Sequence, residues 1–224
     1  MRIMPKVYSI IVHPNEQSLN YSLFKIANKH FIQKGYEVDT VNLYNIREEL
    51  YRATDELEQT KIPLIDRRYK SNYNYNYPSV LKYSAFTAAE VEKLKTSDIL
   101  YIQTPIMVWM MPGILKQYLE SVFVPEGAFR VDQPWSADFE LTRLIAGKKV
   151  FFSIVLGAGV EYTDYIMGSV DNIINPIKSI FCKLVGYEWI EPHITFGITE
   201  TSDKRLEYLD SFQNHLDKIF VDNK

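Results

Sequence analysis

The sequence has very little cysteine, since Cys182 is the only one among its 224 residues. A single cysteine excludes an internal disulfide and any metal site built from several cysteines. It also suits the reducing conditions of the cytosol. No apolar run approaches the ~18 residues of a membrane-spanning helix, and the N-terminal stretch MRIMPKVYSIIVHP has no small-residue cleavage site. We therefore expect a cytoplasmic protein without a membrane span.

Positive charge and glycine-rich motifs are also missing. The formal net charge is -3, so no electrostatic attraction for nucleic acid is expected. The chain contains neither a P-loop nor a GxGxxG motif, which argues against a Walker-type NTPase and a Rossmann dinucleotide site. We expect no metal site. What the sequence does have is aromatic surface, with 16 Tyr, 12 Phe and 3 Trp, which hints at a flat ligand.

Strand and helix patterns alternate along the chain. Strands are predicted at 6–12, 36–44, 98–103, 148–156 and 188–198, and helices at 18–34, 87–97, 112–123, 172–185 and 203–220. Thr87 and Glu90 have the spacing of a capping box at the start of the second helix. The alternation predicts one α/β domain over residues 1–224, a doubly wound five-stranded parallel sheet with helices on both faces.

One segment interrupts this alternation. Residues 47–85 include RRYKSNYNYNYPSVLKY, are rich in Tyr and Asn, and show no helical period. Loops of this length in a compact domain are usually functional or disordered. Two interpretations stay open: a surface excursion, or an arm that reaches a partner subunit or overhangs the site.

Three predicted loops leave the carboxyl ends of strands, where open parallel sheets bind their ligands. The first, His13 to Asn20, leads into a helix whose free N–H groups could hold a phosphate. His13, Ser18 and Asn20 could add donors, although Ser18 could equally serve only as the helix cap. This loop alone is a weak signal.

The other two loops favour a planar ligand. The second, Pro105 to Met111, is apolar yet follows neither the helix nor the strand period, so it either folds into the core or contacts something flat. The third, Gly157 to Tyr162, has small residues that let a ring system approach the backbone. One phosphate-binding loop and two ring-binding loops at one sheet edge match the shape of a flavin nucleotide.

The motifs HPNEQSLN, QTPIMVWMMPGILKQYLESVF with EGAF after it, and NPIKSIFCKLVGYEWIEPHITFGI resemble the flavodoxin-like NAD(P)H:quinone oxidoreductase family. The closest similarity is to its modulator of drug activity B branch. Potassium-efflux ancillary flavoproteins and mammalian quinone reductases are more distant relatives. The resemblance extends from Val7 to about Phe220, without the Tyr/Asn-rich insertion.

The resemblance implies a bound flavin, FAD more than FMN, with NAD(P)H as co-substrate. It places the cofactor-binding residues at His13, Ser18, Leu19 and Asn20 in the first loop, Pro105, Ile106, Met107, Val108 and Trp109 in the second, and Gly157, Ala158 and Gly159 in the third. Tyr162 is the candidate for a catalytic hydrogen bond to the flavin ring and for substrate contact, unless it is simply a surface tyrosine. Phe129 is expected near the substrate. Some relatives pair a tyrosine with a histidine here, but no histidine lies between Gly157 and His193.

The expected activity is two-electron hydride transfer from NAD(P)H to a quinone, by a ping-pong mechanism in one shared pocket. In flavoenzymes the cofactor supplies the redox chemistry and the protein supplies binding and orientation. The first alternative is a regulatory flavoprotein subunit that binds a cation-efflux transporter. A flavodoxin-type electron carrier and a non-flavin binding domain are the others, since fold alone does not fix function.

The family resemblance also implies a homodimer with the active site at the two-fold interface. Aromatic residues that could form such an interface are Tyr118, Phe123, Phe129 and Trp135, with Tyr73, Tyr75 and Tyr77 as a second candidate surface. Large apolar patches are seldom left bare in monomers. We expect Phe129 to lie near the partner's flavin.

Overall fold

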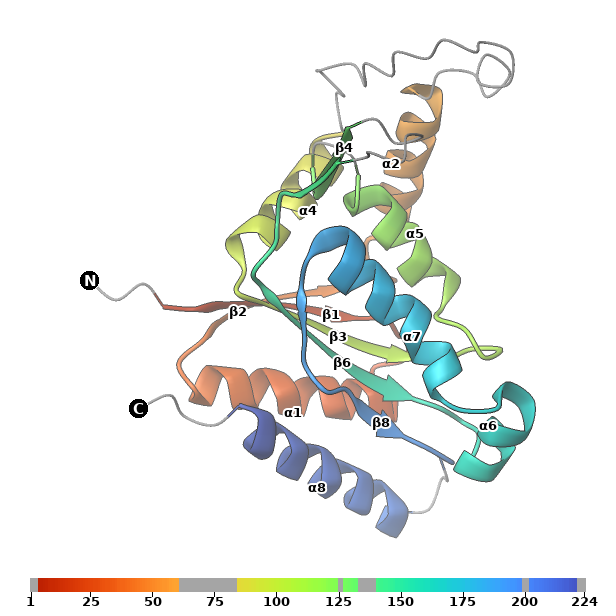
Figure 1. The fold of residues 1–224 in the computed structure, drawn as a ribbon. Coiled ribbons are helices and arrows are strands. Elements are labelled where there is room, and N and C mark those ends of the chain that lie inside the picture. Colours follow the sequence, from red (N-terminus) through yellow and green to blue (C-terminus); the bar gives the residue numbers. More distant parts are fainter. Residues whose placement is uncertain (1–3, 61–83, 125–126, 133–139, 199–201, 221–224) are drawn as a thin grey trace.

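A parallel sheet forms the middle of the computed structural model (Figure 1). The structure describes residues 4–60, 84–124, 127–132, 140–198 and 202–220. The strands of the main sheet are β1 (Lys6–Ile11), β2 (Glu37–Asn42), β3 (Ile99–Pro105), β6 (Lys149–Val155), β7 (Glu188–Trp189) and β8 (His193–Thr195). Their order is β2-β1-β3-β6, with β7 and β8 both paired to the free side of β6. All pairings in this sheet are parallel. The predicted fold class is confirmed.

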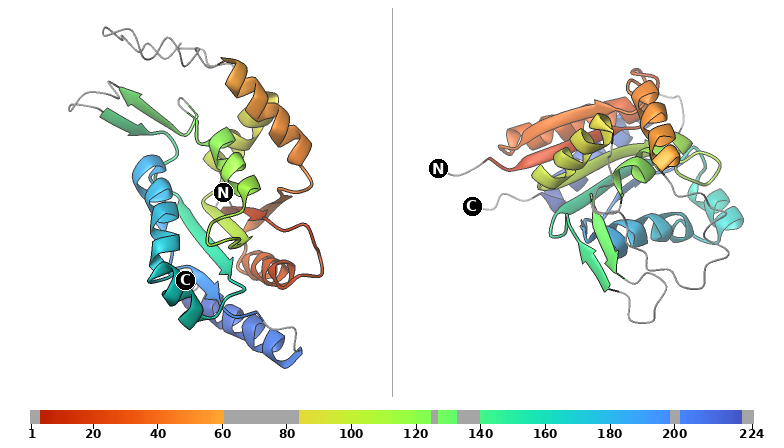
Figure 2. Two further views of the ribbon diagram at one scale, coloured as in Figure 1. Left: turned by 90° about the vertical axis from the view of Figure 1, so that its right-hand side faces the viewer. Right: turned by 90° about the horizontal axis from the view of Figure 1, so that it is seen from above.

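Helices cover both faces of this sheet, as Figures 1 and 2 show. They are α1 (Leu19–Gln33), α2 (Arg47–Thr60), α4 (Ala85–Thr96), α5 (Gly113–Val122), α6 (Val160–Met167), α7 (Asp171–Ser179) with the π-helical segment η1 (Ile180–Val185) after it, and α8 (Ser202–Ile219). Among the described helices, none is long and apolar enough to cross a membrane.

The alternation of side chains along each strand builds two cores. In β1, Tyr8 and Ile10 point toward α2, α4, α5 and α7, whereas Val7 and Ile11 point toward α1 and α8. Both layers are fully buried, which explains why the strands read as continuous apolar runs. The strand ends that emerge from between these layers carry the loops predicted to bind a ligand.

Several predicted elements differ from the structure. Residues 47–60 form α2, so the prediction that this part lacks a helix was wrong, and residues 61–83 lie outside the described part of the chain. The single strand predicted at 188–198 is split into β7 and β8, because Pro192 between them has no N–H to donate to a ladder. Helix α6 and an antiparallel hairpin of β4 (Phe129–Asp132) and β5 (Glu140–Arg143) were not predicted.

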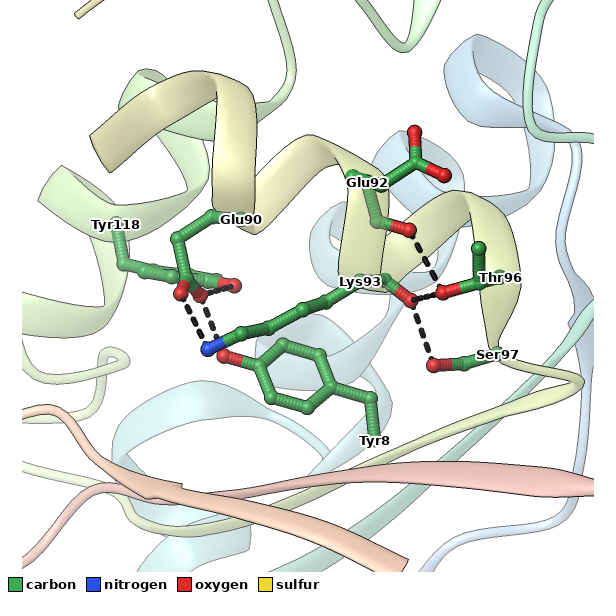
Figure 3. Close-up of polar contacts among 7 residues, drawn as sticks. All are labelled: Tyr8, Glu90, Glu92, Lys93, Thr96, Ser97 and Tyr118. Atoms are coloured by element: carbon green, nitrogen blue, oxygen red, sulfur yellow. Dashed lines mark hydrogen bonds and ion pairs between the residues drawn. The ribbon is translucent and has the colours of Figure 1, made fainter. Parts of the chain in front are cut away.

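The predicted capping box at Thr87 and Glu90 was also wrong. Ser84 caps α4 instead, because its Oγ accepts a hydrogen bond from the Thr87 N–H at 3.1 Å. Glu90 is buried, and its carboxylate accepts hydrogen bonds from Tyr8 and Tyr118 and pairs with Lys93 (Figure 3). Glu90 therefore fixes α4 against β1 and α5.

Candidate functional site

The carboxyl ends of β1, β3, β6 and β8 meet at one edge of the sheet. Three segments leave this edge: the start of α1, the loop between β3 and α5, and the loop between β6 and α6 (Figure 1). The chain order reverses between β1 and β3, where β2 lies on one side of β1 and β3 on the other. Ligands of doubly wound proteins bind outside the strand ends at such a switch point.

The start of α1 has the geometry of a capped helix N-terminus. Ser18 is the cap residue, and its Oγ accepts from the N–H of Tyr21 at 3.3 Å, so the capping role considered from the sequence is confirmed. The N–H groups of the first turn have no intrahelical acceptor and point out of the helix start. Leu19 is buried in the core beneath. Half-buried His13, at the end of β1, accepts the N–H of Asn15 at its Nδ1.

Asn20 lies in this first turn but is only 3% exposed. Its side-chain oxygen accepts a hydrogen bond of 3.0 Å from Nε2 of Gln103, at the end of β3. The side chain of Asn20, predicted to be a donor, is thus held by a hydrogen bond from β3, a contact that no local sequence pattern predicts.

Arg205 is a further candidate that sequence reasoning missed. It comes from α8, yet its Nη2 donates to the carbonyl oxygen of Gln17 at 3.0 Å and to Oγ of Ser22 at 2.7 Å. These contacts place a permanent positive charge beside the start of α1, where a phosphate would lie. Contacts over such a sequence separation follow from the packing of α8 against α1, which no local motif reports.

The loop after β3 turns back on itself at Met107 to Met110. The N–H of Met107 donates to the carbonyl of Met110 at 2.8 Å, and the reverse bond is 3.0 Å. Val108 and Trp109 have φ values of 48° and 62°, the left-handed region in which β-branched and bulky residues are rare. Strain of this kind is often found at ligand-binding sites. Val108 is 91% exposed, so core packing does not account for the strained conformation.

A pocket of about 270 Å³ opens between this turn and the loop after β6. Its lining consists of Ile106, Val108, Trp109, Leu156, Gly157 and Ala158. A Cβ added at Gly157 or Gly159 would meet nothing within 4 Å, so a ring could approach the backbone there. The structure therefore brings the second and third predicted loops together, with an apolar wall on one side and bare backbone on the other.

Tyr162 packs against Trp109, a residue of the pocket lining. The predicted third loop ends earlier than expected, because Gly159 is the cap residue of α6 and Tyr162 is in the helix. The rings of Tyr162 and Trp109 pack edge to face with centroids 5.7 Å apart. The tyrosine is 58% exposed and remains accessible to a ligand.

Phe129 does not line the pocket. It begins β4 and is half-buried against the core on the α5 and α7 side of the sheet. Its predicted contact with the substrate stays a prediction. Tyr118 is only 1% exposed, and its predicted interface role was wrong because its hydroxyl is needed by Glu90 in the core.

Metal ligands are not concentrated at this edge. Among the described residues, no group of three or more His, Cys, Asp or Glu side chains could hold a metal ion. The donors at the edge are instead backbone N–H groups, the Asn20 amide and the Arg205 guanidinium. These groups suit an anion attached to a planar apolar ring.

Comparison with known proteins agrees with this geometry. Residues 5–219 match the model of a family described by its flavodoxin-like fold. An NAD(P)H dehydrogenase [quinone] 1 from Cavia porcellus is 27% identical over 235 residues, which cover 98% of this chain and 79% of that protein.

Two solved structures share the fold. An NAD(P)H:quinone oxidoreductase from Methanothermobacter marburgensis has a TM-score of 0.61 at 16% identity, covering 95% of this chain and 94% of its own. An FMN-dependent NADH-azoreductase from Bacillus anthracis, solved with FMN, has a TM-score of 0.63 at 14% identity, covering 96% of this chain and 99% of its own.

Proposed function

The chain belongs to the flavodoxin-like fold family, and from that premise we propose that it is a flavin-dependent NAD(P)H:quinone oxidoreductase. The observation that carries the proposal is the pocket between the strained turn at Val108 and Trp109 and the open backbone of Gly157 to Gly159. It lies at the same sheet edge as the anion-binding start of α1. The curated relative from Cavia porcellus supports the activity by its name.

The residues present fit a flavin nucleotide. Backbone N–H groups at the start of α1, the Asn20 amide and the Arg205 guanidinium would hold the phosphate. Ile106, Val108 and Trp109 would contact one side of the isoalloxazine ring, and the backbone from Gly157 to Gly159 would lie along its edge. We propose FAD as the cofactor, with FMN as the smaller alternative that the Bacillus anthracis relative binds.

The cofactor supplies the chemistry when bound, taking a hydride from NAD(P)H and passing two electrons to the acceptor. The protein would orient both substrates. Trp109 forms an aromatic wall, and Tyr162 beside it can donate a hydrogen bond from its hydroxyl toward a ring in the pocket. We propose that both substrates use this pocket in turn, which makes the proposed mechanism ping-pong.

The test begins with the purified full chain. It should be yellow, and the flavin released by heat should be identified by chromatography. Steady-state rates with NADPH or NADH and a soluble quinone should give parallel double-reciprocal lines, as alternate use of one pocket requires. Trp109→Ala should lower kcat/KM about fivefold, because an aromatic contact contributes on the order of 1 kcal/mol.

The matched control is Trp189→Ala, which removes a tryptophan that stacks on Phe152 in the core and lies away from the pocket. Its activity per folded molecule should equal that of the wild type. A colourless protein that takes up no added flavin would contradict the proposal. Intersecting lines would leave the flavoenzyme in place but exclude the shared pocket.

A further inference from the structure

A chain of buried polar side chains runs beneath the start of α1. The hydroxyl of Tyr101 donates to Oε1 of Gln103 at 2.7 Å, and Nε2 of Gln103 donates to Oδ1 of Asn20 at 3.0 Å. Tyr101 and Gln103 are fully buried and Asn20 is nearly so. The chain crosses from the middle of β3 to the first turn of α1, through a core layer that is otherwise mostly apolar and aromatic.

Tyr101 is the rigid end of this chain. Its ring is stacked between Phe24 of α1 and Phe151 of β6, with centroid distances of 6.1 and 5.4 Å. Burial raises the pKa of Tyr101 well above its ordinary value, so the hydroxyl keeps its proton and can donate. A phenylalanine would fill the same space without any polar atom. The hydroxyl therefore serves a purpose other than filling the core.

The direction of the hydrogen bonds decides which end of the Asn20 amide faces outward. Gln103 donates a hydrogen bond to the amide oxygen of Asn20. The NH2 group of Asn20 has no partner among the residues that the structure describes. That NH2 group lies in the first turn of α1, beside N–H groups that also seek an acceptor. If the amide were reversed, its oxygen would face any anion bound there and would repel it.

We propose that Tyr101 is a positioning residue for the phosphate of the cofactor, acting through Gln103 to hold the NH2 group of Asn20 toward the start of α1. This inference rests on the proposed function. It adds that the protein selects the phosphorylated form of the flavin through a buried chain that never touches the ligand. Ser153, the partner of Gln103 in the strand register, places another buried hydroxyl next to the chain.

The test compares two ligands that differ only by the phosphate. The full chain, freed of flavin, is titrated with FMN and with riboflavin while flavin fluorescence is followed. Tyr101→Phe should raise the dissociation constant for FMN about tenfold, because a charge-assisted hydrogen bond is misaligned. The dissociation constant for riboflavin should not change. The control Tyr118→Phe removes a buried, hydrogen-bonded hydroxyl on the opposite face of the sheet and should alter neither value.

A second variant tests whether Tyr101 acts through Gln103. Gln103→Met keeps the shape but cannot form hydrogen bonds, and it should weaken FMN binding by itself. In that background, Tyr101→Phe should have no further effect. Three results would overturn this inference but not the proposed function. They are an equal loss of affinity for FMN and riboflavin in Tyr101→Phe, an unchanged FMN affinity in that variant when it is folded, and additive losses of FMN affinity in the double variant of Tyr101 and Gln103. A wild-type protein that binds neither flavin would overturn the proposed function as well.

Discussion

A histidine ring that is buried among other rings resists protonation, and His193 in β8 is such a residue. Its ring lies 4.8 Å from that of Phe212 and 5.4 Å from that of His215, and its buried Nδ1 has no hydrogen-bond partner among the described residues. Burial, together with the smaller effect of the nearby charge of His215, lowers the pKa of His193 from 6.5 to about 4.

This pKa predicts a loss of stability in mild acid. Between pH 6.5 and 4 the unfolded chain binds the proton and the folded chain does not, so stability is complete above about pH 6.5 and falls as the pH approaches 4. The loss assigned to this residue is roughly 3 kcal/mol. His193→Phe cannot be protonated, and urea unfolding of this variant at pH 7.5 and 4.5 should show a correspondingly smaller difference than in the wild type. Equal differences in the two proteins would contradict the assignment.

Single residues show where sequence reasoning reaches its limit. The helix cap at Ser18 could be anticipated, because capping depends on neighbours three residues away. Glu90 has the local spacing of a capping residue, but it is buried in the core, where it accepts hydrogen bonds from tyrosines of β1 and α5. Arg205 reaches the start of α1 from the other end of the chain. Local chemistry was predictable, whereas partners brought together by tertiary packing were not.

At the scale of elements, apolar patterns identified the main strands and helices well. The misses share a physical cause. Helix α6 is mostly exposed, with only Thr163 buried, and so has almost no apolar stripe to recognise. Helix α2 is strongly polar, and its few buried residues, such as Leu50 and Ala53, are too sparse to mark a period. The loop after β3 was correctly predicted as neither helix nor strand. Its tight turn could not be predicted, because the two residues with left-handed backbone, Val108 and Trp109, are not glycines.

Two glycines at helix ends allow a test of how η1 is fixed. Gly35 and Gly186 follow α1 and η1 with φ values of +82° and +89°. A Cβ at Gly35 would meet nothing, but one at Gly186 would lie 2.5 Å from Cδ of Arg143, whose guanidinium donates to the carbonyl of Lys183. Gly35→Ala should lower the free energy of unfolding by about 1 kcal/mol, because of the left-handed backbone alone. Gly186→Ala should cost roughly 1–3 kcal/mol more through overpacking.

Urea unfolding of both variants measures the difference, and Gly35→Ala is the matched control for the backbone cost. If the two substitutions were equally destabilising, the contact between η1 and the Arg143 end of β5 would not constrain the structure. A larger loss at Gly186 would show that the hairpin of β4 and β5 is fixed at its base.

At the scale of the whole molecule, the doubly wound sheet follows from the alternation of strands and helices and could be predicted, apart from the split of its last strand into β7 and β8. The sheet in turn brings the three loops to one edge, so the location of the candidate site was predictable too. The detailed arrangement of side chains in the site could not be predicted. The contact between Trp109 and Tyr162 and the support beneath Asn20 depend on distances of a few ångströms that only packing fixes.

The surface around the pocket carries the last prediction, which concerns assembly. Val108 and Met110, in the turn after β3, are 91% and 70% exposed, and Tyr165, in α6 after the other pocket loop, is 83% exposed. Large side chains exposed together in this way are usually covered in the assembled protein. We predict a homodimer that uses this face, with a mass in light scattering of about twice 26.2 kDa.

Tyr165→Lys should weaken the dimer, because the lysine would place an unpaired charge in the interface. Ile32→Lys introduces the same charge at the end of α1, remote from the pocket, where Ile32 is 61% exposed. This control variant should leave the mass unchanged. A wild-type monomer with full quinone reductase activity would show that each chain holds a complete site and that the exposed face has another use.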